Sequence, residues 1–169
     1  MPLSPPVART AKPIRRVTYH GFERAAGLWD IEGELHDSKA HDMPRSRAPG
    51  QLRLAGEPIH HMWLRVTVNT DLVVQAIEAS LDSHPLGGCP ESLRSIQSMV
   101  GCSMGRGWRK AIQTNLGGTT GCTHIRELLF NLATAAFQSL PAAFGTTDSE
   151  PPRHLNQCTG WDFNGDAVK

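Results

Sequence analysis

Two stretches in the first half of the chain alternate strictly between apolar and polar residues. The alternation covers residues 28–35 and 62–68 and is typical of antiparallel strands with one buried face. Residues 17–22 and 72–79 predict two further strands, although the second run also has a spacing that a helix can adopt. The turn signal at 69–71 favours the strand, because it closes a hairpin with the strand before it.

Beyond residue 88 the apolar spacing becomes helical. A first helix is expected to start at Cys89, placed as the N-cap before Pro90, and a second covers 108–116 and ends at two glycines. A third covers 125–137, with Thr123 as its N-cap. Apolar residues line one face of this third helix: Ile125, Leu128, Leu129, Leu132 and Ala136. Strands followed by helices predict an α+β fold, with an antiparallel sheet of about four strands and three helices packed on one face.

Composition and charge restrict the partners that we expect. The 17 Lys and Arg residues nearly balance the 16 Asp and Glu residues, which predicts neither nucleic acid nor an anionic membrane as a partner. The chain has no apolar run as long as a signal-peptide core or a membrane span, which predicts a cytoplasmic protein. A Pro-rich extended arm is expected at 1–13 and a single α+β domain at 14–169.

A thiol and an imidazole lie two positions apart at the start of the third predicted helix. Cys122 and His124 follow a glycine-rich run at 117–121. The positive end of a helix stabilises a thiolate, which is the form of cysteine that binds metals and attacks electrophiles. Cys89 has the same place in the first predicted helix, so the two thiols are candidates for one shared site. In a reducing compartment the four cysteines are expected as thiols or ligands rather than disulfides.

Histidines and aspartates near the strand ends can complete such a site. We expect Cys122 and His124 to bind a divalent metal, zinc or iron, and the remaining metal ligands to come from Cys89, Asp37 or His60. The candidate catalytic residues are then Cys122, His124 and His60, around a metal that polarises a water or a substrate oxygen. Tryptophans and the apolar strand face predict a small aromatic or acyl substrate.

Three alternatives stay open on the sequence alone. In a metal-free transferase or hydrolase, Cys122 is a nucleophile activated by the helix end and by a nearby histidine. In a non-enzymatic protein, the chain is a scaffold or binding module related to iron–sulfur assembly. In a purely structural interpretation, Cys122 packs as a small apolar residue and His124 caps the helix. The oligomeric state is open, and a homodimer is among the states allowed.

Four blocks of the sequence resemble the signatures of the bacterial DUF2889 family. The blocks are LWDIEG at 28–33 with DSK at 37–39, GEPIH at 56–60 with MWLR at 62–65, GCTH at 121–124 with ELL at 127–129, and LNQC at 155–158. The resemblance covers nearly the whole chain and implies a bacterial single-domain protein without an established activity. His61 departs from it, because the resemblance implies an acidic residue there.

The order of elements is also similar to the iron–sulfur scaffold fold of the NifU and SufE type. Strands are followed by a cysteine at a helix start, Cys89, and then by the Cys122–His124 pair before the last helix. That resemblance implies Asp, Cys and His residues around a metal or a nascent cluster. No cysteine precedes Cys89, and the Cys-x-His order differs from the adjacent His-Cys of that family. We therefore expect a metal-capable pocket rather than cluster assembly.

Overall fold

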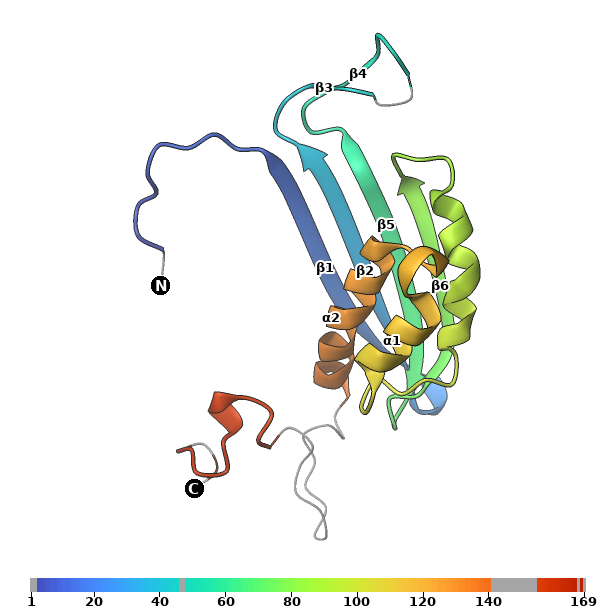
Figure 1. Cartoon of the computed structure of the whole chain (residues 1–169). Helices are drawn as coiled ribbons and strands as arrows, with labels where there is room; N and C mark the ends of the chain where they lie inside the picture. The colour runs from blue at the N-terminus through green and yellow to red at the C-terminus, as the bar shows by residue number, and fades with distance from the viewer. Residues whose placement is uncertain (1–2, 46–47, 141–154, 167, 169) are drawn as a thin grey trace.

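The computed structural model describes residues 3–45, 48–140, 155–166 and 168, and one four-stranded antiparallel sheet organises it (Figure 1). The order of the strands in the sheet is β1–β2–β5–β6. These strands are β1 (Pro13–Arg24), β2 (Leu28–Lys39), β5 (Pro58–Asn69) and β6 (Val74–Ser83). β1, β2 and β5 each contain one of the predicted strands, and β6 overlaps the fourth but begins two residues later than predicted, at Val74. The predicted antiparallel sheet is confirmed.

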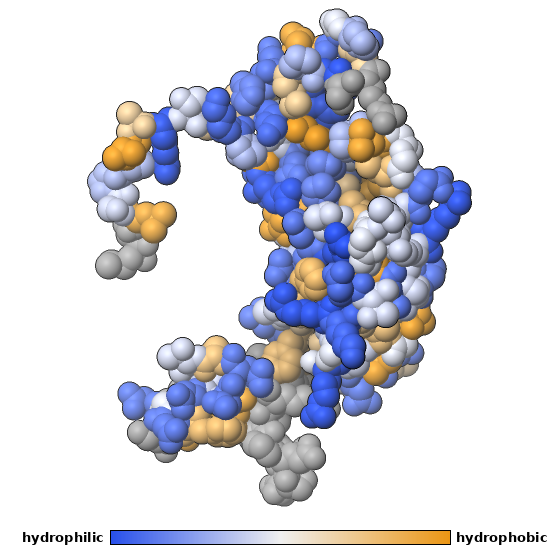
Figure 2. Space-filling model, viewed as in Figure 1, coloured by the Kyte–Doolittle hydropathy of each residue, from blue (hydrophilic) through white to orange (hydrophobic). Residues whose placement is uncertain are grey.

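Helices from the second half of the chain cover one face of this sheet (Figure 1). The first, η2 (Cys89–Met99), packs on β6, α2 (Thr123–Ser139) packs on β1 and β2, and α1 (Trp108–Leu116) contacts both η2 and α2. Large core side chains come from both layers and include Ile31, Leu35, Met62, Ile112, Leu129 and Leu132. On the outer side of the helices, apolar residues are scattered among polar ones (Figure 2). The predicted α+β architecture is confirmed.

The first of these helices is a 3-10 helix rather than the kind expected from its apolar spacing. Ser92, Ser95 and Ser98 each donate their hydroxyl to the carbonyl three residues earlier. Such bonds compete with regular α-helical bonding and suit the tighter 3-10 turn. Cys89 is the first residue of this helix and Gly88 is the N-cap, so the N-cap predicted at Cys89 is wrong.

Helix α2 has Cys122, not Thr123, as its N-cap. Cys122 has extended torsions of φ −89° and ψ 134°, and Thr123 already belongs to the helix, so the cap predicted at Thr123 is wrong. The sulfur of Cys122 therefore lies at the positive end of a 17-residue helix.

Short elements complete the described part of the chain. They are η1 (Ala25–Gly27), η3 (Gly118–Thr120), η5 (Thr159–Trp161), and a small hairpin of β3 (Met43–Pro44) and β4 (Leu52–Arg53). Residues 3–12, within the predicted arm, have exposed side chains. None of the helices in the described ranges is both long enough and apolar enough to cross a bilayer.

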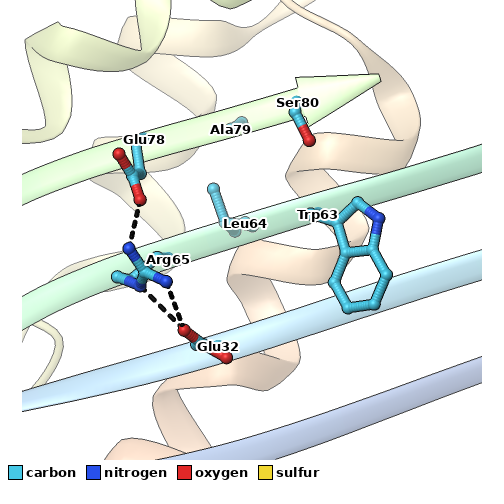
Figure 3. A pocket seen from close by; sticks show the side chains of 7 residues that line it. All are labelled: Glu32, Trp63, Leu64, Arg65, Glu78, Ala79 and Ser80. Carbon is cyan, nitrogen blue, oxygen red and sulfur yellow. Dashed lines mark hydrogen bonds and ion pairs between the residues drawn. The ribbon is translucent and has the colours of Figure 1, made fainter. Parts of the chain in front are cut away.

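The uncovered face of the sheet carries charged side chains and a shallow pocket (Figure 3). At its centre Arg65 of β5 donates hydrogen bonds to Glu32 of β2 and Glu78 of β6. The residues that line the pocket are Glu32, Trp63, Leu64, Arg65, Glu78, Ala79 and Ser80. The carboxylates at the centre of this pocket are therefore already paired with arginine.

Candidate metal centre

Three residues on adjacent strands form a row across the covered face of the sheet. Arg15 on β1 is paired with Asp37 on β2, and Asp37 is paired with His60 on β5. Directly paired residues of antiparallel strands extend their side chains to the same face. The β2–β5 register shifts between Asp37 and Ser38, as at a β-bulge, so regular pairing ends beside this row.

His124, in the first turn of α2, brings a second imidazole to the row. Asp37 Oδ2 is 3.1 Å from His60 Nδ1 and 3.8 Å from His124 Nε2. The centroids of the two imidazole rings are 3.9 Å apart, with the rings tilted by 39°. One possible ligand atom from each of the three side chains lies within 4.8 Å of the other two. Within the described ranges, Asp37, His60 and His124 form the group of side chains that is close enough to hold one metal ion.

The guanidinium of Arg15 binds the Asp37 carboxylate with two donors. Nε lies 2.7 Å from Oδ1 and Nη2 lies 2.8 Å from Oδ2, while Nη1 lies 2.6 Å from Glu127 of α2. Burial on its own raises the pKa of Asp37, but the hydrogen bonds and charge of Arg15, with the help of His60, outweigh burial and lower it. Asp37 is therefore a carboxylate at neutral pH.

His60 is held in its neutral form. Burial lowers the pKa of His60, and the charge of His124 lowers it further, while Asp37 acts in the opposite direction without reversing the result. Neutral imidazole is the form of histidine that binds metals.

Cys122 contacts the other nitrogen of His124, with 3.7 Å between Sγ and Nδ1. Burial on its own raises the pKa of Cys122, but hydrogen bonds from the side chain of His124 and from the backbone N–H groups of Ile125 and His124 outweigh burial and lower it. The hydrogen bond with Cys122 raises the pKa of His124 against the opposing effect of burial. Without a metal, this contact favours a thiolate beside an imidazolium.

The structure brings most of the predicted site residues together. Asp37, His60 and His124 converge, and Cys122 joins them through His124. Cys89 starts η2, which packs on β6 and α1, and it does not belong to this group. Cys122 faces Nδ1 of His124, whereas Asp37 faces Nε2, so the sulfur lies on the other side of the ring from the carboxylate.

Arg15 was not among the predicted site residues, and the first predicted strand began only at residue 17. A usable signal exists in the sequence Ala25-Ala26-Gly27, because counting residues outward from a turn at this place pairs Arg15 with Asp37. Successive side chains of a strand point to opposite faces of the sheet, so the neighbours His60 and His61 lie on different faces. His61 points to the uncovered face, where its Nε2 lies 2.8 Å from Glu34.

Comparisons with known proteins place the chain in a family. The model of the family described as "Protein of unknown function (DUF2889)" matches residues 14–138. This range contains β1 to α2 almost completely and includes the whole candidate site. No curated protein and no solved structure matches the chain, so the resemblance to the NifU and SufE fold is unconfirmed. Because the matched range covers well over half of its residues, the chain belongs to the DUF2889 family.

Proposed function

We propose that the protein binds a divalent metal ion, zinc or iron, through Asp37, His60 and His124 and uses it to act on a small organic substrate. The observation that carries this proposal is the convergence of one carboxylate and two imidazoles from β2, β5 and α2. Two histidines and one carboxylate form the donor set of zinc peptidases and of non-haem iron enzymes.

A set of three protein ligands favours a catalytic role over a structural one. Structural zinc sites are closed by four protein ligands, whereas catalytic sites keep a position for water or substrate. The side chains of Asp37, His60 and His124 are 13%, 16% and 20% exposed, so the cluster is partly accessible to solvent. A bound metal supplies a Lewis acid or an activated water at such a position.

In this proposal Cys122 orients a metal ligand instead of being one. Nε2 of His124 is turned toward Asp37, which leaves Nδ1 to donate its proton to the Cys122 sulfur. Metal-bound imidazoles usually donate their second N–H to a neighbouring acceptor, and that bond fixes the ring and its tautomer.

We infer an aromatic or acyl substrate and a bacterial cytoplasmic location, as the sequence predicts. The four cysteines are free thiols, which is typical of proteins in a reducing compartment. The nearly balanced charge gives no long-range attraction to nucleic acid or to an anionic membrane.

Elemental analysis of protein purified without a metal-affinity column tests the proposal. We expect near-stoichiometric zinc or iron in the wild type and little in the His60→Ala variant. His61→Ala is the matched control, because His61 is the next residue on β5 and points to the opposite face. Equal metal content in the two variants, or a wild-type protein without metal, would contradict the proposal.

Metal-free cysteine catalysis is a second candidate function. The observation that favours it is a sequence of contacts from the Cys122 sulfur through His124 to Asp37, with distances of 3.7 and 3.8 Å. A nucleophile, a base and a group that orients the base have this order in cysteine hydrolases and transferases. Cys122 would attack the acyl carbon of a substrate, and His124 would pass a proton to the leaving group.

A further inference from the structure

Arg15 donates two hydrogen bonds to the Asp37 carboxylate at the cluster, and neither candidate function uses it. We propose that Arg15 is a positioning residue of the metal centre, which holds the Asp37 carboxylate with Oδ2 turned toward the two histidines. This inference rests on the proposed metal-binding function and names the residue that prepares that site for the ion.

The two oxygens of Asp37 have different surroundings. Oδ1 accepts a hydrogen bond from Arg15 Nε, and Oδ2 accepts one from Arg15 Nη2. Oδ2 is also the oxygen that lies 3.1 Å from His60 and 3.8 Å from His124. A planar guanidinium that binds both oxygens fixes the plane of the carboxylate, which a single donor does not do. Arg15 therefore binds both oxygens, and it holds the carboxylate so that Oδ2 also faces the two imidazoles.

The pairing of the strands makes this arrangement possible. Arg15 lies directly opposite Asp37, and the Asp37 side chain is only 13% exposed, whereas that of Arg15 is 42% exposed. The terminal torsion of an aspartate is broad, so an unrestrained carboxylate samples many orientations. Removal of the two-donor contact would return that freedom to Asp37 and misalign Oδ2 for part of the time.

Arg15 has a second contact, with Glu127, which is separable from the first. That ion pair joins β1 to α2, and both side chains are about half exposed, at 42% and 47%. Exposed ion pairs contribute little to stability, about 0 to 1 kcal/mol. A Glu127→Gln variant therefore removes the link to the helix and leaves the contact between Arg15 and Asp37 in place.

The informative change at this position is Arg15→Lys. The positive charge of Arg15 repels a nearby metal ion. A neutral replacement would therefore change metal affinity in two opposing ways, by removing this repulsion and by releasing the Asp37 carboxylate. Lysine keeps the charge but donates from a single point, so it loses only the two-donor geometry. The matched control is Arg65→Lys on the uncovered face, because Arg65 directs Nε and Nη2 to Glu32 and Nη1 to Glu78.

Cobalt(II) titration of the metal-depleted full chain, followed by visible absorption, measures affinity and ligand geometry together. Loss of a partner that orients a metal ligand typically weakens binding by about 10- to 100-fold. We expect a loss of this size and a changed cobalt spectrum for Arg15→Lys. We expect near wild-type affinity and spectrum for Arg65→Lys and Glu127→Gln.

Each other outcome overturns a distinct claim. Wild-type affinity and spectrum in Arg15→Lys would overturn the role of Arg15 and leave the metal centre intact. An equal loss in Glu127→Gln would show that Arg15 acts by docking α2 and not by orienting the carboxylate. A wild-type chain that binds no cobalt would overturn the metal function and this inference with it.

Discussion

At the scale of single residues, His124 is the side chain on which both candidate functions depend. Its Nε2 faces Asp37 and its Nδ1 faces Cys122, while its ring packs against that of His60. The two nitrogens of an imidazole can serve different partners, so the ring can bind a metal on one side and exchange a proton on the other. A change at His124 should therefore affect metal content and thiol reactivity together.

We predict that Cys122 is alkylated faster than Cys158 near neutral pH, although Cys158 is the more exposed of the two. The lowered pKa of Cys122, caused by His124 and by the backbone N–H groups at the helix start against the opposing effect of burial, increases its thiolate fraction. A time course with iodoacetamide, read by peptide mass spectrometry, gives the rate at each cysteine.

The control for this labelling is His124→Ala, which should slow the reaction of Cys122 and leave that of Cys158 unchanged. If Cys158 reacts first in the wild-type protein, the helix end and the imidazole do not activate the thiol. The second candidate function would then lose its support.

Four residues of the candidate site were predictable from the sequence, but the contacts between them were not. Periodicity places Cys122 and His124 at a helix start and Asp37 and His60 near strand ends. It does not say how these elements are positioned against one another. Arg15 enters the site through the register of β1 against β2, which depends on turn geometry as well as on apolar pattern.

At the scale of elements, the docking of α2 decides whether the cluster forms. This helix supplies His124 and the Cys122 cap, and it packs on β1 and β2. Near its other end it passes close to Gly21 of β1. A Cβ at Gly21 would lie 1.9 Å from Ser139 Oγ and 2.8 Å from Ser139 Cβ, so the missing side chain allows the close approach.

We predict that Gly21→Ala destabilises the protein, because the added methyl group collides with Ser139. Overpacking of this kind typically costs about 1–3 kcal/mol in the free energy of unfolding. Urea denaturation measures the change. Gly87→Ala is the control, since a Cβ at Gly87 meets no atom within 4 Å.

The contact with Ser139 can be tested by a double-mutant cycle. Ser139→Gly removes both colliding atoms, so Gly21→Ala should cost far less in that background than in the wild type. An undiminished cost would mean that the close approach of α2 to β1 is not what requires glycine at position 21.

Strands were predicted better than helices for a physical reason. Alternation reports directly on a sheet with one covered face, and it located β2 and β5, whereas residue preference and a turn signal indicated β1 and β6. Apolar spacing does not separate a 3-10 helix from an α-helix over 11 residues, and in η2 the serine hydroxyls favour the tighter form. Cys89 does start η2, but a place at a helix start does not say where the helix packs, and this is why Cys89 was wrongly expected beside Cys122.

At the scale of the whole molecule, the sheet separates two polar surfaces. The row of Arg15, Asp37 and His60 lies under the helix layer, whereas Glu34 and His61 pair on the uncovered face. The uncovered face also holds the shallow pocket around Arg65. The metal proposal uses only the covered face, and this is why His61 and Arg65 are matched controls for His60 and Arg15.

The most direct test of the account is an anomalous difference map from crystals of the metal-bearing protein, recorded at the absorption edge of the metal. We predict a peak at about 2.0–2.2 Å from one atom each of Asp37, His60 and His124, as expected for zinc–nitrogen and zinc–oxygen bonds. A peak bound to the Cys122 sulfur and away from Asp37, or a map without a peak at the cluster, would contradict it.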